Sequence, residues 1–176
     1  MKILKVLLIL IVGLFACLAV GGMFINSKYS VTRSIDIKAT PDKVYALVAA
    51  PKAWKQWSVW NQRDPNMAIS YSGPDSGVGA VWEWKSKSEG DGRMTMTAAE
   101  PGKRVAMDLY FPDWDSTSPG EISFSVNGDM THVEWSMSAD TGKNPLMHWF
   151  ALLGPGMIAP DFDAGLKNLK TLAEKP

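Results

Sequence analysis

The sequence holds few side chains suited to acid–base or nucleophilic chemistry. Its two histidines are His132 and His148, and its one cysteine is Cys17. His132 falls on the polar side of a predicted strand, so we expect it to face solvent. No carboxylate is spaced from His148 in the sequence in a way that suggests a His–carboxylate pair. No nucleophile elbow, phosphate loop, metal-ligand pair or Cys/His pair is recognisable. We therefore predict no catalytic residue, no metal and no cofactor.

An acid or base that works inside a cavity must point inward from its strand. Four acidic residues of the predicted strands alternate outward instead: Glu83, Asp108, Glu121 and Glu134. The inward exceptions are Arg33 and, at a strand end, Glu100. A buried guanidinium needs acceptors or an anionic ligand head, which makes Arg33 a candidate ligand-binding residue. The alternative is that Arg33 reaches the cavity mouth or a nearby carbonyl group.

Tryptophan is the most unusual residue type in this chain, with eight copies, and three of them lie close together in "KAWKQWSVW". Trp54, Trp57 and Trp60 recur at a spacing of three, which places them near one helical stripe. We predict that Trp57 is packed core and that Trp54 and Trp60 lie nearer the rim of an opening.

Length and charge limit the classes of function. A chain of 176 residues is long enough for one domain with a real core. The eighteen basic and eighteen acidic residues give a net charge of zero, and the sequence has no Lys/Arg block. We therefore do not expect nucleic-acid binding. One cysteine excludes an intramolecular disulfide. We expect a monomer held together by packing.

The first residues predict a membrane anchor. Residues 6–25 carry no charge for twenty positions, which as a helix matches the ~30 Å hydrocarbon core of a bilayer. Lys2 and Lys5 precede this segment, so the N-terminus is expected in the cytoplasm and the domain in the periplasm. We divide the chain into an anchor at 1–27 and a domain at 28–176, on the inner membrane. A cleaved signal peptide and a lipoprotein site at Cys17 are the alternatives.

Periodicity beyond the anchor predicts a strand, a short helix, a meander and a final helix. Residues 30–39 alternate as a strand, and "TPDKVYALV" then combines an N-cap threonine with proline at the first helical position. Short alternating runs separated by turn residues follow, which is typical of an antiparallel meander. Residues 144–175 are helical in character but punctuated at "GPG" and Pro160. Their last part is amphipathic and must lie on the dry face of the sheet.

Three stretches carry a family resemblance. "VTRSIDIKATPDKVYALV", "WKQWSVWNQRDPNM" with "YSGPDSGVGAVWEW", and "PDFDAGLKNLKTL" resemble the bacterial SRPBCC proteins described as polyketide cyclase/dehydrase-like. The resemblance implies an α+β helix-grip (START-like) fold, with a curved antiparallel sheet of six to seven strands wrapped around a long C-terminal helix and one transmembrane helix in front. It also implies a cavity between helix and sheet, but no reaction.

We predict a membrane-anchored protein that binds an apolar small molecule or lipid in this cavity. One alternative is a cyclase- or hydratase-like enzyme, which needs at least one inward acid or base and would be favoured by His148 or Glu100 inside the cavity. The other is a protein-interaction module related to chaperone activators. Apolar and adaptable walls suit lipid-like ligands. The predicted ligand-binding residues are Arg33, Trp54, Trp60, Trp82, Trp84, Met94, Met96, Met107, Leu109, Phe111, Phe124, Trp135, Met137, Trp149, Met157 and Phe162.

Overall fold

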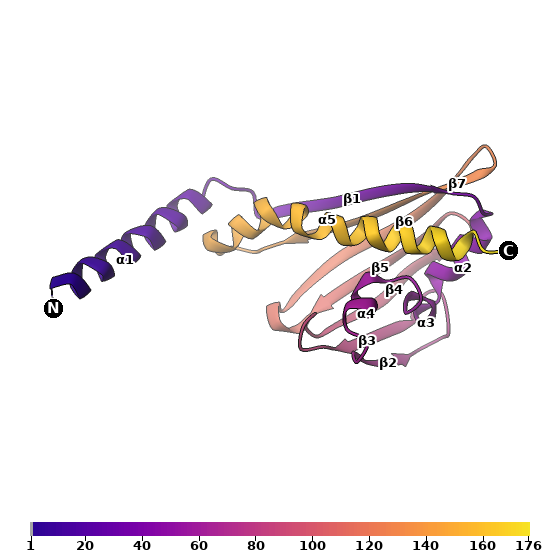
Figure 1. The fold of residues 1–176 in the computed structure, drawn as a ribbon, viewed down its shortest axis with the longest axis horizontal. Helices are drawn as coiled ribbons and strands as arrows, with labels where there is room; N and C mark the ends of the chain where they lie inside the picture. Colours follow the sequence, from indigo (N-terminus) through magenta and orange to yellow (C-terminus); the bar gives the residue numbers. More distant parts are fainter. Residues whose placement is uncertain (1) are drawn as a thin grey trace.

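A computed structural model describes residues 2–176, which form one apolar helix followed by a sheet that cradles a long helix (Figure 1). The first helix, α1 (Lys2–Gly22), extends away from the rest of the chain. It is the one helix in the described part of the chain that is long and apolar enough to cross a membrane. An apolar N-terminal helix is therefore confirmed.

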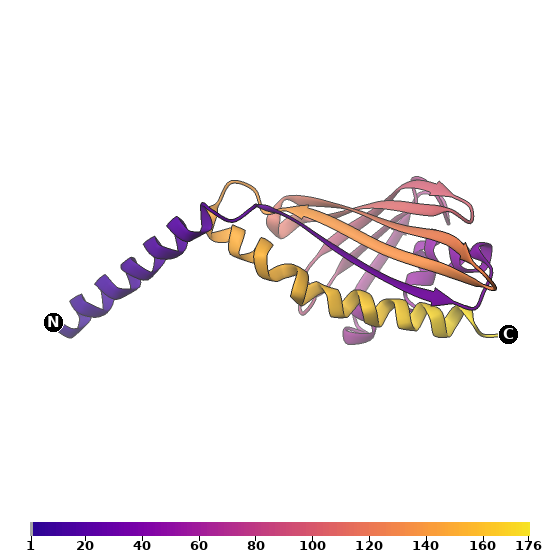
Figure 2. The same cartoon turned by 90° about the horizontal axis from the view of Figure 1, so that it is seen from above.

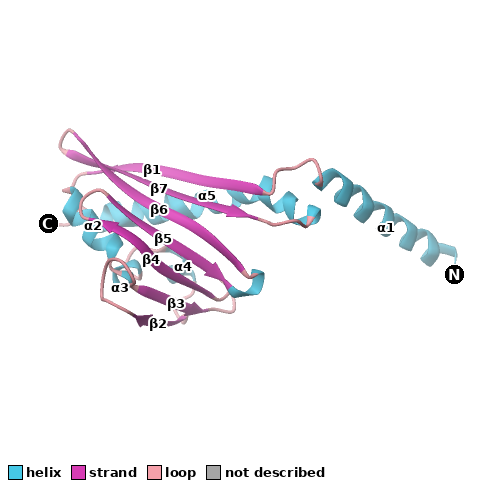
Figure 3. Ribbon diagram, turned by 180° about the vertical axis from the view of Figure 1, so that it is seen from behind, coloured by secondary structure: helices cyan, strands magenta, loops and turns pink. Residues whose placement is uncertain are grey.

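The sheet is built from seven antiparallel strands in the order β1-β7-β6-β5-β4-β3-β2 (Figure 3). The first strand pairs with the last because the chain returns along it, and the other strands follow as a meander. This topology confirms the predicted helix-grip fold. The strands are β1 (Lys28–Ile37), β2 (Ala68–Ser72), β3 (Val81–Lys85), β4 (Gly92–Glu100), β5 (Arg104–Phe111), β6 (Ser116–Asn127) and β7 (Met130–Asp140).

Short helices connect several of the strands, and the first of them begins with ordinary capping chemistry. The side chain of Thr40 accepts a hydrogen bond from the backbone N–H of Lys43, and Pro41 occupies the first position of α2. The short helices are α2 (Pro41–Ala49), α3 (Pro51–Trp54), α4 (Val59–Arg63) and the 3-10 turn η1 (Pro112–Trp114).

The last helix, α5 (Pro145–Ala173), runs unbroken for 29 residues beneath the sheet (Figure 2). The expected interruption at "GPG" and Pro160 is therefore wrong, because both Pro155 and Pro160 lie inside the helix. An internal proline removes one hydrogen bond and costs about 3 kcal/mol. Burial of Ala151, Ala159 and Phe162 against the rest of the fold offsets that cost.

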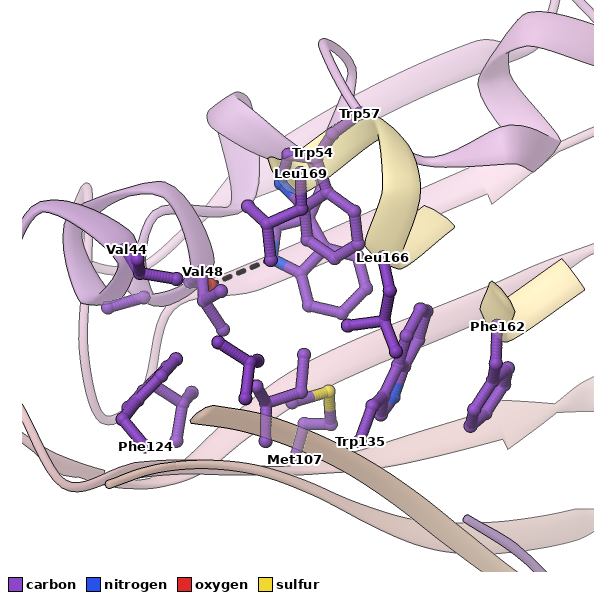
Figure 4. Packing of buried hydrophobic residues seen from close by; sticks show 14 of the residues in the cluster. Val44, Val48, Trp54, Trp57, Met107, Phe124, Trp135, Phe162, Leu166 and Leu169 are labelled. Carbon is purple, nitrogen blue, oxygen red and sulfur yellow. Dashed lines mark hydrogen bonds between the residues drawn. The ribbon is translucent and has the colours of Figure 1, made fainter. Parts of the chain in front are cut away.

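The core lies between the concave face of the sheet and the C-terminal half of α5 (Figure 4). Leu166 and Leu169 of α5 are buried there together with Val44 and Val48 of α2. The ring of Trp135 on β7 stacks on Phe162, with 4.0 Å between centroids and 11° between planes. Aromatic rings thus fill the middle of the grip.

Candidate functional site

A largely apolar cavity lies at the other half of α5, away from this packed core. Its volume is about 470 Å³, within the range of small-ligand pockets. We call it the α1-side cavity. Its lining residues are Tyr29, Phe111, Trp114, Asp115, Ser116, Ser118, Met137, Ala139, Asp140, Thr141, Gly142, Met147, Phe150 and Ile158.

Sheet topology places this cavity at the end of the sheet next to α1. β1 begins at Lys28, six residues after the last residue of α1, and pairs there with Asp140 at the end of β7. On the neighbouring pair of strands, Phe111 at the end of β5 lies opposite Ser116 at the start of β6. All four strand ends therefore lie at the same end of the sheet, and the first turns of α5 lie beneath them (Figure 2). Met147 and Phe150 of these turns line the cavity.

The lining is mostly apolar, with polar groups at its margin. The ring of Tyr29 meets Phe150 edge to face at 6.1 Å between centroids. Burial raises the pKa of the Tyr29 hydroxyl, so this group is a neutral hydrogen-bonding partner. The backbone N–H of Gly142 donates to Asp140 at 2.9 Å and lowers the pKa of that carboxyl. The carboxylate of Asp115 accepts from the hydroxyl of Tyr110 at 3.1 Å, so both acids already have partners.

The last turn of α1 is joined to the first turns of α5 at the margin of the cavity. The indole N–H of Trp149 donates to the carbonyl oxygen of Leu18 at 2.9 Å. The two ring nitrogens of His148 lie 2.8 Å from the carbonyl oxygen of Gly22 and 3.0 Å from that of Gly142. A Cβ on Gly22 would lie 2.0 Å from the backbone oxygen of Pro145, so only glycine permits this approach. The junction fixes α5 relative to α1.

Two of the sixteen predicted ligand-binding residues, Phe111 and Met137, line the α1-side cavity. Most of the others face the concave side as predicted but pack against one another in the core. The buried members of this set are Trp54, Trp82, Met94, Met96, Met107, Phe124, Trp135 and Phe162, and Trp60, Trp84 and Leu109 pack against them while partly exposed. Trp149 lies at the junction described above, and Met157 is exposed on α5.

The predicted rim position of Trp54 is wrong. Trp54 is 2% exposed and Trp57 is fully buried, with ring centroids 4.3 Å apart. The indole N–H of Trp54 donates to the carbonyl oxygen of Val48 at 2.7 Å, which allows a tryptophan to be buried without an unpaired donor. Trp60 is partly exposed and meets Trp135 edge to face. The cluster is therefore core, and only Trp60 lies toward its edge.

The charged candidates lie at the surface. Arg33 donates to the carbonyl oxygen of Thr32 and to Asp163 of α5 at 3.3 Å, with 42% of its side chain exposed. Glu100 accepts from Arg104 at 2.7 Å at the far end of β4. These placements match the alternative given above for Arg33, and Glu100 lines no part of the α1-side cavity.

Neither histidine is among the residues that line the α1-side cavity. His132 lies 2.8 Å from the carboxylate of Asp36 on the neighbouring strand, on the convex side of the sheet. Both ring nitrogens of His148 lie within hydrogen-bond distance of backbone oxygens at the junction. Within residues 2–176, no group of three or more histidine, cysteine or acidic side chains is arranged to hold a metal ion.

Solved structures share this fold at low sequence identity. Norcoclaurine synthase from Thalictrum flavum, in complex with dopamine and hydroxybenzaldehyde, matches with a TM-score of 0.63 and 12% identity over 85% of this chain and 89% of that one. A protein from Chromobacterium violaceum matches with a TM-score of 0.62 and 15% identity over 84% and 98%. The Aha1 dimer from Colwellia psychrerythraea matches with a TM-score of 0.58 and 18% identity over 82% and 96%.

The sheet, the long helix beneath it and the hollow at their margin define a helix-grip protein of the SRPBCC class. Residues 28–174 match the model of the family described as polyketide cyclase / dehydrase and lipid transport. The chain belongs to this family. No curated protein sequence matches it.

Proposed function

We propose that this chain is a single-pass membrane protein that binds an apolar small molecule or lipid in the α1-side cavity. The observation that carries the proposal is the place of the cavity, at the end of the sheet to which the apolar α1 is joined. If α1 spans the bilayer, it keeps the cavity close to the membrane from which a lipid or apolar ligand would come. We assign residues 1–27 to the anchor and 28–176 to the binding domain, with the N-terminus cytoplasmic and the domain periplasmic.

Several features support binding of an apolar ligand. Phe111, Met137 and Phe150 supply apolar walls, while the hydroxyl groups of Tyr29 and Ser118 offer hydrogen bonds to a polar end. The description of the family includes lipid transport as well as cyclase and dehydrase. An enzyme would need an available acid or base, and the carboxylates at the margin already accept hydrogen bonds within the protein.

Retention of lipids by the full chain tests the proposal. The protein in detergent micelles is incubated with a bacterial membrane extract and examined by native mass spectrometry for bound species. Ala139→Phe places a ring in the cavity, and Ser138→Phe places the same ring on the opposite face of β7 as a control. We expect wild type and Ser138→Phe to retain a lipid or apolar molecule and Ala139→Phe to lose it. No retained species in the folded wild type would refute the proposal.

A further inference from the structure

The N-terminal half of α5 presents a wide apolar surface to its surroundings. From Pro145 to Pro160 the sequence "PLMHWFALLGPGMIAP" contains no Asp, Glu, Lys or Arg. Five large apolar side chains of this segment are 37% to 66% exposed. We call this surface the outer apolar face; it consists of Leu146, Phe150, Leu152, Leu153 and Met157.

The same side of α5 becomes polar in its C-terminal half. Asp163 and Lys167 are exposed there, as expected for a helix whose outer side faces water. A soluble domain rarely leaves a large apolar surface uncovered, so the outer apolar face needs an occupant. The change from apolar to charged within one continuous helix indicates two different surroundings along its length.

The junction with α1 identifies that occupant. Trp149 and His148 tie the first turns of α5 to the last turn of α1, and the connecting Met23 and Phe24 are 69% and 87% exposed. The outer apolar face is thus continuous with the exposed apolar surface of α1. In Figure 2 the sheet lies on one side of α5, and α1 descends from the junction toward the other side. The outer apolar face therefore points to the side on which α1 lies.

We propose that the outer apolar face lies in the interfacial layer of the lipid bilayer that α1 spans, as a second membrane contact. This inference rests on the proposed membrane anchoring. A helix with one apolar side and aromatic residues suits such a position. Lys28 and Lys143 are exposed beside the junction and attract anionic headgroups. Phe150 belongs both to this face and to the cavity wall, so the contact brings the cavity against the bilayer.

Spin labels on the full chain in vesicles of phosphatidylglycerol and phosphatidylethanolamine test this inference. Leu153→Cys and Lys167→Cys, each in a Cys17→Ser background, place labels on the outer side of the two halves of α5, at positions exposed enough to leave packing intact. Native Cys17, exposed on α1, reports on the anchor. Collisions with oxygen, which concentrates in lipid, are compared with collisions with a water-soluble nickel chelate.

We expect the labels at positions 17 and 153 to collide with oxygen and to be shielded from the nickel chelate, and the label at 167 to show the reverse. A water-exposed label at 153 together with a lipid-exposed label at 17 overturns this inference and leaves the anchor intact. A label at 153 shielded from both reagents indicates a protein partner or a second copy and also overturns it. A water-exposed label at 17 refutes the membrane anchor itself, and a lipid-exposed label at 167 refutes the division of α5 into two halves.

Discussion

Replacement of Leu169 by alanine tests how the structure divides α5 into a core half and an outer half. Leu169 is fully buried between α2 and the tryptophan cluster, as Figure 4 shows. Leu→Ala at such a site removes buried apolar surface and leaves a cavity, and the cost is about 2–5 kcal/mol. Taking about 3 kcal/mol and ~2–4 °C per kcal/mol for a domain of this size, the expected fall in Tm is roughly 6–12 °C.

Leu152→Ala is the matched control, because it removes the same atoms from the same helix at a position that is 58% exposed. We expect a change within about 0.5 kcal/mol, since its side chain contributes little to packing within the fold. Thermal unfolding of the full chain in detergent micelles, followed by near-UV circular dichroism of the buried tryptophans, measures both. Equal shifts in the two variants would show that α5 is not divided in this way.

Two further predictions concern hydrogen bonds. Trp54→Phe keeps an aromatic ring but removes the N–H that donates to the carbonyl oxygen of Val48 in the core. We expect the free energy of unfolding, measured by thermal unfolding, to fall by about 1–3 kcal/mol. An unchanged Tm would contradict the buried hydrogen bond. The hydrogen bond with His132 lowers the pKa of Asp36, so the stability that Asp36 contributes is present above about pH 4 and lost as the pH falls below it. The difference in Tm between wild type and Asp36→Asn should therefore shrink on acidification, and a constant difference would contradict this linkage.

Strand faces could be predicted from the sequence because side chains alternate strictly along a strand. Alternation alone predicts the dry face for Met94, Met96, Met107 and Trp135, and each is at most 3% exposed. The same reasoning failed for Trp54, since a spacing of three defines one stripe only within a continuous helix. The chain leaves helical geometry between α3 and α4, and Trp54 turns into the core.

The α1-side cavity was beyond prediction from periodicity. Its wall is assembled from the start of β1, the ends of three other strands, η1 and the first turns of α5. Tyr29 precedes the strand predicted at residues 30–39, and Trp114 lies in the turn between β5 and β6, where no periodic pattern assigns a face. The position of α5 also depends on its contacts with α1, which pair residues about 130 positions apart. Composition predicts that the cavity walls are apolar, but it does not predict where in the fold the cavity lies.

The prolines and glycines of "GPGMIAP" explain a second wrong prediction, the interruption of the C-terminal helix. These residues predict breaks in the helix, but α5 continues through them. What changes near Pro160 is the surroundings of the helix, because the outer side carries Leu152 and Leu153 before it and Lys167 after it. A helix that passes from a bilayer surface into water would need this change in composition without any change in backbone geometry. The sequence pattern therefore marks the proposed boundary of the membrane contact within a single helix.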